Sequence, residues 1–226
     1  MVRKYPVPSG VEGKAKAAGE AGLRWLENLD ALVDSLAAQW NISLGSVING
    51  GTHALVVEAV NGEGVACVLK VEIPDTDETE FMRGVSILQA ADGHGYARMY
   101  ACDVGNRAVL LERLGMRMRL AGIPARRQME ILCAALEDTW LMKLDTTGLP
   151  DGSDSIAWFR EFIPEAWKLL NRPCSERVIA QAMRCLDARE EKLNPAEYVI
   201  LHGDAHNNNA LQTAEGGENF TQTQEV

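Results

Sequence analysis

Three segments rich in β-branched residues, joined by two glycine turns, constrain the fold of this chain more than any other feature. The segments run from Ile42 to Ile48, from His53 to Val60 and from Val65 to Val71. Asn49-Gly50-Gly51-Thr52 joins the first two segments, and Asn61-Gly62-Glu63-Gly64 joins the last two. Turn sequences of this kind connect neighbouring antiparallel strands. The sequence therefore predicts a three-stranded antiparallel meander.

Helical periodicity flanks this meander on both sides. Before it, apolar residues recur at three- and four-residue intervals from Leu23 to Trp40, while two glycines between Lys14 and Gly22 predict a frayed or broken start. After it, a helix is predicted from about Thr76 or Asp77 to Ala91, because Asp and Thr can cap its start and Asp92-Gly93 ends it. One predicted helix thus precedes the meander in the sequence, and another follows it.

Two further strands and a helical second half complete the predicted α+β fold. The strands are expected at Tyr96 to Asp103 and Ala108 to Arg113, and the helices at Pro124 to Leu144, Ser155 to Leu170 and Glu176 to Leu193. We expect the aromatic side chains Trp158, Phe159, Phe162 and Trp167 to lie in the core. The chain then has an N-terminal helical segment (1–40), a lobe with a small antiparallel sheet (41–114) and a mainly helical lobe (115–226).

Composition and charge exclude several classes of protein. With 226 residues, of which 46% are hydrophobic and 24% charged, the chain has the composition of an ordinary soluble globular protein. Its net charge of −10 argues against nucleic acid as a partner, because phosphate backbones require basic patches. The same charge is compatible with a cationic small molecule. No apolar stretch reaches the length of a membrane span, so no membrane partner is expected.

The cysteines and the first residues indicate a cytoplasmic protein. There are five cysteines, an odd number without a Cys-x-x-Cys pair, which predicts reduced thiols and not a disulfide framework or a zinc ribbon. Residues 1–10 carry two prolines where a secretion signal would have an apolar segment. The sequence leaves the oligomeric state open between a monomer and an oligomer.

A polar loop near the end of the chain carries the strongest chemical signal. Val199 to Leu201 predicts a short buried strand that runs into His202-Gly203-Asp204, and Asn209 follows five residues after Asp204. The catalytic loop of protein kinases has the same Asp-to-Asn spacing. There the Asp orients the attacking hydroxyl and the Asn holds a magnesium ion. Asp204 is therefore the candidate catalytic residue, and Asn209 is the candidate magnesium ligand.

Two other interpretations of this loop stay open. Asn, Asp and Gly after an apolar run often form only a turn, because these residues tolerate left-handed backbone conformations. His202 and His206 have the spacing of zinc ligands on a helix, although Gly203 and three consecutive asparagines disfavour a helix there. A nucleotide site earlier in the chain would favour the kinase-like interpretation.

Lys70 and the first glycine turn are the candidates for such a nucleotide site. Lys70 lies between apolar residues on the third predicted strand, where its ammonium group needs either solvent or an anion. In the kinase pattern this lysine contacts the α- and β-phosphates and pairs with a helix glutamate, a role for which Glu80 is chosen here. Gly50 and Gly51 can bring backbone N–H groups close to a phosphate, although Gly-Gly in a hairpin is also an ordinary turn.

The end of the fifth predicted strand is the candidate adenine-binding segment. A buried apolar strand from Ala108 leads through Glu112, Arg113 and Leu114 to Gly115. Where a small lobe passes into a larger one, the backbone of these three residues is available to hydrogen-bond an adenine ring. A plain strand end is the alternative interpretation.

Together these motifs resemble the aminoglycoside phosphotransferase superfamily, and within it the streptomycin and hydroxyurea phosphotransferase branch. The residues that carry the resemblance are Gly50-Gly51, Lys70, Leu110-Leu111-Glu112-Arg113-Leu114 and His202-Gly203-Asp204-x-His206-x-x-Asn209. Trp25 and Ala37 to Trp40 also match that branch.

The resemblance implies a protein-kinase-like two-lobed fold, with ATP and Mg²⁺ as cofactors. It implies transfer of the γ-phosphoryl group to a hydroxyl of a small molecule, such as streptomycin or a hydroxyurea-like antibiotic, in antibiotic resistance or secondary metabolism. It also implies that Asp204 is the catalytic base, Asn209 a magnesium ligand, Lys70 the phosphate-binding lysine, and Glu112 to Leu114 the adenine-binding segment.

Two departures from the family pattern bear on activity. The helix glutamate of the family aligns with Gly84, and the family's Ile-Asp-Pro-x-Gly strand, whose Asp binds magnesium, is not found. Counted from Asn209, that Asp falls near Gln224, whose neutral amide is a weaker magnesium ligand than a carboxylate. We therefore expect a C-terminally shortened family member and a weak catalyst. The alternative functions are a nucleotide-binding remnant without transferase activity and a kinase of a metabolite such as an amino alcohol.

Overall fold

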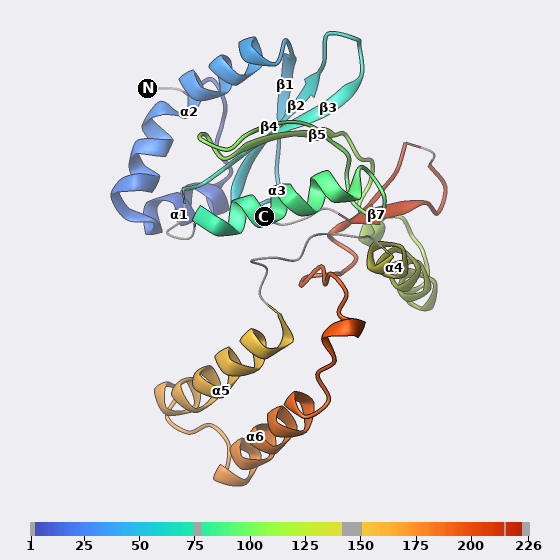
Figure 1. Cartoon of the computed structure of the whole chain (residues 1–226). Coiled ribbons are helices and arrows are strands. Elements are labelled where there is room, and N and C mark those ends of the chain that lie inside the picture. The colour runs from blue at the N-terminus through green and yellow to red at the C-terminus, as the bar shows by residue number, and fades with distance from the viewer. Residues whose placement is uncertain (1–2, 75–77, 142–150, 215, 223–226) are drawn as a thin grey trace. The chain divides into compact units, whose positions relative to one another are not determined.

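The structure, a computed structural model, describes residues 3–74, 78–141, 151–214 and 216–222. It separates into two compact units (Figure 1). The first unit comprises Met1–Leu144 and Ile200–Val226, and the second comprises Asp145–Val199. The first unit holds both sheets and every candidate site residue.

A five-stranded antiparallel sheet forms the centre of the first unit. Its strands are β1 (Ser43–Ile48), β2 (Ala54–Val60), β3 (Ala66–Glu72), β4 (Met99–Asp103) and β5 (Ala108–Glu112). They are arranged in the order β1-β2-β3-β5-β4. The predicted meander is confirmed, because β1 pairs with β2 and β2 with β3 in antiparallel register. The pairing of β3 with β5 then places Lys70 opposite Val109, in the middle of the sheet.

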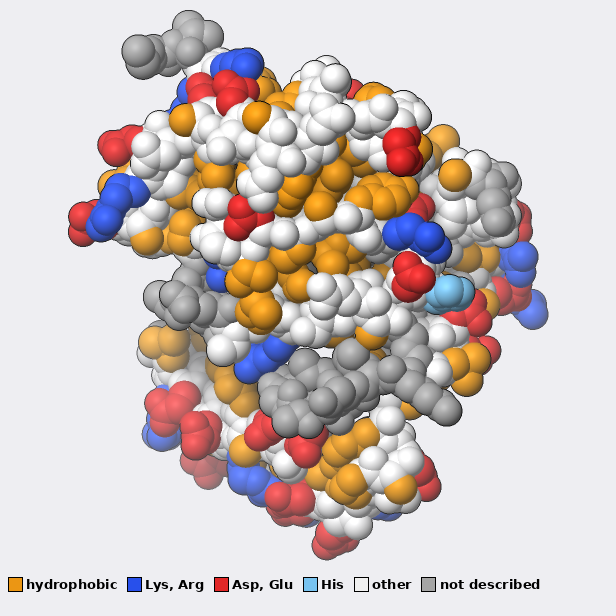
Figure 2. Space-filling view, turned by 45° about the horizontal axis from the view of Figure 1, so that its top comes forward, with side chains coloured by type: hydrophobic (Ala, Val, Ile, Leu, Met, Phe, Trp, Pro, Cys, Tyr) orange, Lys and Arg blue, Asp and Glu red, His pale blue; other side chains and the backbone are white. Residues whose placement is uncertain are grey.

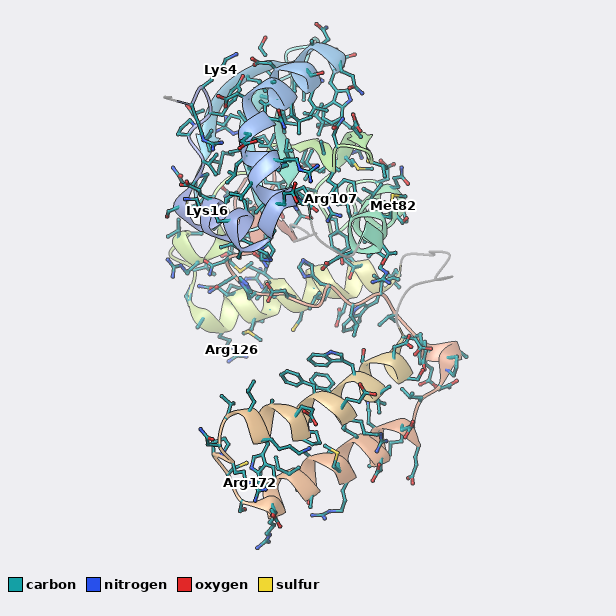
Figure 3. The ribbon with its side chains drawn as sticks, turned by 90° about the vertical axis from the view of Figure 1, so that its left-hand side faces the viewer. Lys4, Lys16, Met82, Arg107, Arg126 and Arg172 are labelled. Atoms are coloured by element: carbon teal, nitrogen blue, oxygen red, sulfur yellow. The ribbon has the colours of Figure 1, made fainter. Side chains whose placement is uncertain are left out.

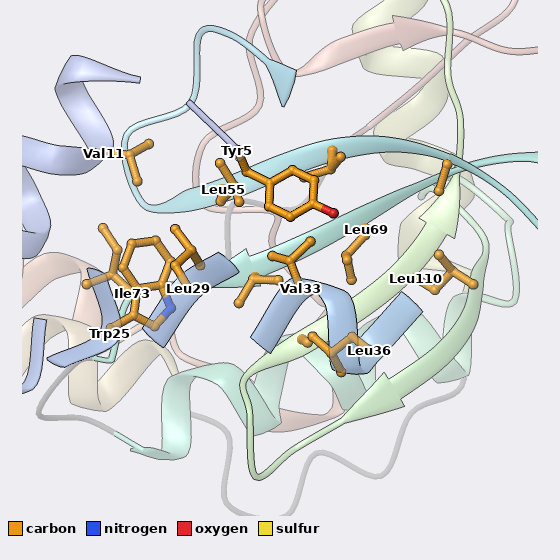
Figure 4. Packing of buried hydrophobic residues seen from close by; sticks show 14 of the residues in the cluster. Tyr5, Val11, Trp25, Leu29, Val33, Leu36, Leu55, Leu69, Ile73 and Leu110 are labelled. Carbon is orange, nitrogen blue, oxygen red and sulfur yellow. The ribbon is translucent and has the colours of Figure 1, made fainter. Parts of the chain in front are cut away.

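Two helices, α1 (Ser9–Ala17) and α2 (Gly19–Gln39), cover one face of this sheet. The predicted break between them is confirmed: Gly19 has a φ of +70°, a conformation that favours glycine. Gly22 lets the helices touch, since a Cβ there would lie 1.9 Å from the carbonyl oxygen of Ala15. Figure 4 shows how Leu29 and Val33 of α2 pack toward the strands, where alternate residues of β3 and β5 point at them.

The third helix, α3 (Glu78–Ala91), packs on the opposite face of the sheet. Phe81, Val85 and Leu88 are buried there in one cluster with Val109 and Leu111 of β5. Residues on the same strands therefore divide between the two faces with a period of two. This alternation fixes the side chain of Lys70 on the same face as Val68, the face of α3.

The remaining elements of the first unit follow β5. They are the 3₁₀ turn η1 (Met118–Leu120), the helix α4 (Ala125–Trp140) and a two-stranded sheet of β6 (Ala210–Gln212) and β7 (Phe220–Gln222). Met118 is fully buried and joins α4 to this small sheet, in a cluster with Ile131, Ala210 and Phe220. The β6–β7 hairpin therefore rests on α4 and η1.

The predicted buried strand at 199–201 is wrong. These residues form no strand, and Leu201 is 71% exposed. Among the described residues no ladder partner lies beside them, and a single extended segment cannot satisfy its backbone hydrogen bonds without one. Only Ile200 packs inward, against the cluster of α3 and β5. Within residues 199–201, Ile200 is thus the residue that anchors the chain to this cluster.

The second unit is a helical hairpin of α5 (Gly152–Leu169) and α6 (Glu176–Glu190), followed by the 3₁₀ turn η2 (Pro195–Glu197). Asp151 caps α5 through a reciprocal capping box with Asp154. Arg160 joins the helices by ion pairs with Asp187 and Glu190. Two helices have little interior, and Ile156 is the only hydrophobic residue buried in the described part of this unit.

The expectation that the aromatic residues of α5 form a core is therefore wrong for three of them. Trp158, Phe159 and Phe162 are 55%, 43% and 48% exposed, and they stack on one another. Trp167 is partly buried, and its Nε1 donates a hydrogen bond to the carbonyl oxygen of Cys174. The reason is geometric, because a pair of helices offers only one narrow apolar seam.

On the face shown in Figure 2, acidic, basic and hydrophobic side chains are interspersed. Among the described helices, none combines the length and the apolar character that a bilayer crossing requires.

Candidate functional site

A pocket of about 430 Å³ lies in the first unit, on the same face of the sheet as α3. Six of the nine candidate residues line it: Gly50, Gly51, Lys70, Glu112, Leu114 and Asn209. They come from four separate stretches of the sequence, which the sheet and the loop before β6 bring together. Arg113, Glu80 and Asp204 do not line this pocket.

Apolar side chains of three strands form the deep wall of the pocket. Val56 of β2, Val68 of β3 and Leu111 of β5 point to this face, and Leu211 of β6 also lines the pocket. Their alternation follows from the period of the strands, because the intervening residues pack against α1 and α2. A slot with apolar walls fits a flat aromatic ring such as adenine.

The segment after β5 borders this slot. The side chain of Glu112 accepts a hydrogen bond from the backbone N–H of Arg98, and Arg113 forms an ion pair with Glu58. Leu114 lines the pocket, and no described residue accepts a hydrogen bond from its N–H. The two charged side chains are therefore used to hold neighbouring strands. The backbone N–H of Leu114 is therefore the group of this segment that is available to a ligand in the pocket.

The glycine turn between β1 and β2 forms another edge of the pocket. Gly50 has a φ of +111°, which other residues rarely adopt. A Cβ at Gly50 would also lie 2.8 Å from Nη2 of Arg117. The conformation and the close approach together explain why the sequence has glycine at this position.

Lys70 reaches into the pocket and pairs with Glu72 of its own strand. Their Nζ and Oε1 atoms are 3.0 Å apart, and the side chain of Lys70 is only 13% exposed. Glu72 also pairs with Arg107, whose Nη2 lies 3.4 Å from Oε2. Arg107 lies beside α3, with its guanidinium over the ring of Phe81 (Figure 3). The lysine is thus oriented by a buried carboxylate.

The expected pairing of Lys70 with Glu80 is corrected by this arrangement. Glu80 is exposed on α3 and lines a separate hollow with Lys14 and Arg107. Residues two apart on a strand share a face, so Glu72 lies beside Lys70 without any contribution from a helix. Among the described residues, Glu72 is the carboxylate that pairs with Lys70.

Burial governs the ionisation of Glu72. Removal from water raises the pKa of Glu72 above its ordinary value, and the charges of Lys70 and Arg107 oppose this shift without cancelling it. The carboxylate is therefore costly to keep ionised, and it depends on both cations. Any change to Lys70 or Arg107 then disturbs Glu72 as well.

The loop from His202 to Asn209 holds the candidate catalytic carboxylate. Nδ2 of Asn209 donates hydrogen bonds to Oδ2 of Asp204 at 2.9 Å and to its carbonyl oxygen at 3.1 Å. Asn209 is 6% exposed, whereas the side chain of Asp204 is 56% exposed. The other carboxylate oxygen, Oδ1, accepts no hydrogen bond from a described residue. One oxygen of Asp204 is therefore fixed, and the other is open to a ligand.

The two histidines of this loop serve its structure. Nδ1 of His202 and Nδ1 of His206 accept the backbone N–H groups of Asp204 and Asn208, at 3.2 and 3.1 Å. His202 stacks on Tyr96 with ring centroids 5.6 Å apart, and Nε2 of His206 lies 3.3 Å from Oδ2 of Asp204. The described residues gather no cluster of three or more His, Cys, Asp or Glu side chains that would hold zinc.

Asp204 and Asn209 have the donor chemistry that magnesium prefers. Carboxylate and amide oxygens are hard ligands, and protein-bound Mg²⁺ takes much of its remaining coordination from phosphates and water. The residues present therefore fit this ion. Gln224, where the family pattern has a metal-binding Asp, lies outside the described residues.

Sequence reasoning missed two arginines at this pocket. Arg117 and Arg119 both line it, one on either side of the buried Met118. The only sequence signal was the alternation of arginine with apolar residues in Met116-Arg117-Met118-Arg119-Leu120. This pattern alone does not indicate a ligand, because the two arginines face the pocket only in the folded turn.

Comparison with known proteins gives a consistent set of relatives. Residues 39–219 match the family described as aminoglycoside/hydroxyurea antibiotic resistance kinase. The chain is 27% identical over 197 residues to a streptomycin 6-kinase of Streptomyces glaucescens, an alignment that covers 87% of this chain and 62% of that protein. It is 30% identical over 118 residues to the streptomycin 6-kinase of Streptomyces griseus, covering 52% of this chain and 38% of that protein. The chain thus spans less than two thirds of either relative.

Solved structures show the same fold. The streptomycin–ATP–APH(2″)-IIa ternary complex superposes with a TM-score of 0.51 at 13% identity, covering 85% of this chain and 69% of that chain. The protein-kinase-like α+β fold that the sequence predicts is confirmed by this likeness.

Proposed function

Because the chain belongs to the aminoglycoside/hydroxyurea antibiotic resistance kinase family, we propose that it is an ATP-dependent phosphotransferase. It transfers the γ-phosphoryl group to a hydroxyl of a small molecule of the streptomycin class. One observation carries the proposal: Gly50, Lys70, Leu114 and Asn209 converge on one pocket, and Asn209 holds Asp204 at its edge.

In this proposal the apolar slot binds the adenine ring, and the polar rim of the pocket binds the phosphates. The adenine ring lies between Val56, Val68 and Leu211, where the Leu114 N–H is available to a ring nitrogen. The phosphates lie near Gly50 and Lys70, because an ammonium group and backbone N–H groups stabilise phosphate oxygens. Asn209 would hold Mg²⁺, which supplies positive charge against the charge of the phosphates.

Asp204 accepts the hydrogen bond of the attacking hydroxyl. Its Oδ2 is held by Asn209 and His206, so Oδ1 is the atom that faces an acceptor. As the hydroxyl oxygen bonds to the γ-phosphorus, the bond to the β,γ-bridging oxygen breaks, ADP leaves, and the hydroxyl proton passes to Asp204. Phosphoryl transfer needs orientation and charge stabilisation more than a strong base, and a fixed carboxylate provides that orientation.

The experiment that tests this function measures ADP formation by the chain with ATP, magnesium and single acceptors. Streptomycin, hydroxyurea and choline separate the antibiotic hypothesis from that of an amino alcohol kinase. Asp204→Asn measures the background in the same assay. Streptomycin-dependent ADP formation above that background supports the proposal. Equal ADP formation by both proteins with every acceptor contradicts it.

A further inference from the structure

Two arginines line the pocket without a role in the proposed phosphoryl transfer. Arg117 and Arg119 flank Met118, which is fully buried against Ala210 and Phe220. A buried anchor between them fixes the backbone, and so both side chains start from a rigid turn. Both line the pocket that the glycine turn and Asn209 also line.

The guanidinium of Arg117 lies against the glycine turn. Its Nη1 and Nη2 atoms would be 3.1 and 2.8 Å from a Cβ at Gly50. The backbone of Arg117 is held from the other side by a bridge to Leu211 of β6, and Gly115 N–H donates to the carbonyl oxygen of Gln212 at 2.7 Å. The irregular segment that follows the adenine-binding residues therefore carries Arg117 to the glycine turn.

Arg119 is tied to the catalytic loop. Its backbone N–H donates to the carbonyl oxygen of Asn207 at 3.0 Å, and Asn207 in turn bonds Gln128 of α4 through its side chain at 2.7 Å. Asn207 lies between Asp204 and Asn209 in sequence. The short η1 turn thus reaches from the glycine turn to the loop that holds the candidate base.

Neither guanidinium is neutralised by the part of the chain that the structure describes. No carboxylate of these residues lies within ion-pair distance of Arg117 or Arg119, whereas Arg107, Arg113 and Arg127 all have such partners. The contrast is notable in a chain with 32 acidic and 22 basic residues. Arg117 is partly buried, whereas Arg119 is exposed. A partly buried guanidinium without an anion, as at Arg117, is unfavourable, and phosphate oxygens match the planar donor geometry of either arginine.

We propose that Arg117 binds the phosphate tail of the nucleotide and that Arg119 supplies a second cation on the side of Asp204. This assignment rests on the proposed function, and it adds two residues to that site. Arg117 contacts the phosphates from beneath the glycine turn, opposite the apolar slot for the base. Arg119, nearer the catalytic loop, stabilises the charge that spreads over the transferred phosphoryl group.

The test compares the affinities for magnesium-ATP and for adenosine by calorimetry. The proteins are the wild-type chain, Arg117→Gln, Arg119→Gln and the control Arg126→Gln. Arg126 is a matched control because its side chain is 93% exposed on α4 and points away from the sheet (Figure 3). Loss of a charged hydrogen-bond partner should weaken ATP binding by Arg117→Gln about ten- to a hundredfold, with adenosine affinity unchanged. Arg126→Gln should bind both ligands as the wild type does.

Two results would overturn the assignment while leaving the nucleotide site intact. One is wild-type ATP affinity in Arg117→Gln, and the other is an equal loss of ATP and adenosine affinity, which would mean a general disturbance of the pocket. Arg117→Lys should restore part of the ATP affinity, because it returns the charge without the planar fork. A wild-type chain that binds neither ligand would refute the proposed function itself.

Discussion

Asn209 holds Asp204 through two hydrogen bonds from one amide nitrogen, to the carboxylate oxygen at 2.9 Å and to the main-chain oxygen at 3.1 Å. The five-residue spacing read from the sequence is thus a contact in the fold. Because Asn209 is nearly buried and Asp204 is largely exposed, the asparagine gives the carboxylate a fixed orientation at the edge of the pocket.

Asn209→Ala tests this relationship. Removing the amide leaves Oδ2 of Asp204 with only His206, so we expect kcat to fall about tenfold or more through lost orientation. If Asn209 also holds magnesium, the magnesium concentration at half-maximal rate rises in the same variant. The measurement is the initial rate at several magnesium concentrations. Wild-type kcat together with an unchanged magnesium dependence would rule out both roles.

Asp204→Asn separates catalysis from binding. The amide keeps the shape of the side chain but cannot take the hydroxyl proton, so kcat should fall by at least about a hundredfold. Affinity for ATP should not change, because Asp204 does not line the pocket. Asp92→Asn, at a carboxylate that is 73% exposed on the surface, serves as the control. Near-normal turnover by Asp204→Asn would mean that the loop is structural.

Lys70→Met tests the phosphate-binding lysine. Methionine retains most of the length and loses the charge, so magnesium-ATP affinity should fall about tenfold or more. Lys16→Met, at an exposed lysine on α1 (Figure 3), should leave it unchanged. Calorimetry gives both affinities directly. An unaltered affinity in Lys70→Met would remove the lysine from the nucleotide site.

Glu72→Gln tests the buried carboxylate through the pH dependence of stability. Burial raises the pKa of Glu72 in the folded chain, so the folded state binds this proton more tightly than the unfolded state. The contribution of protonated Glu72 to the free energy of unfolding is therefore fully present below the unfolded-state pKa of 4.5. It is lost as the pH rises through the pKa of Glu72 in the folded chain. Relative to Glu72→Gln, the wild type should lose stability from pH 4 upward.

The measurement is the free energy of unfolding in urea, for both proteins, at a series of pH values. The difference between the two proteins removes the contribution of every other titrating group. A difference that stays constant with pH, or that grows in favour of the wild type, would show that Lys70 and Arg107 outweigh burial.

The parts of the sheet and of the site that depend on local sequence were predictable. Strand periodicity and the glycine turns fix the meander and place Lys70, and the spacing of Asp204 and Asn209 needs no tertiary information. The partner of Lys70 was not predictable, since Glu72 becomes its neighbour only once β3 is extended and Arg107 closes over it. The strand at 199–201 was predicted from apolar composition, but a strand also requires a neighbour.

Arg117 and Arg119 could not have been assigned from sequence. Their position depends on Met118 being buried against β6 and on the bridge between Arg117 and Leu211, both of which join residues far apart in the chain. The exposure of Trp158 and Phe162 likewise depends on how few elements the second unit contains. Local sequence patterns therefore predicted the residues of the loop, but they did not predict that Arg117 and Arg119 line the pocket.

The most direct test of the account follows the γ-phosphoryl group itself. The chain is incubated to an end point with magnesium, γ-labelled ATP and streptomycin, and the products are separated and identified by mass spectrometry. We predict labelled streptomycin that carries one added phosphoryl group, formed by the wild type and at least about a hundredfold more slowly by Asp204→Asn. Label that remains on ATP or appears only as inorganic phosphate, to the same extent in both proteins, would contradict the account.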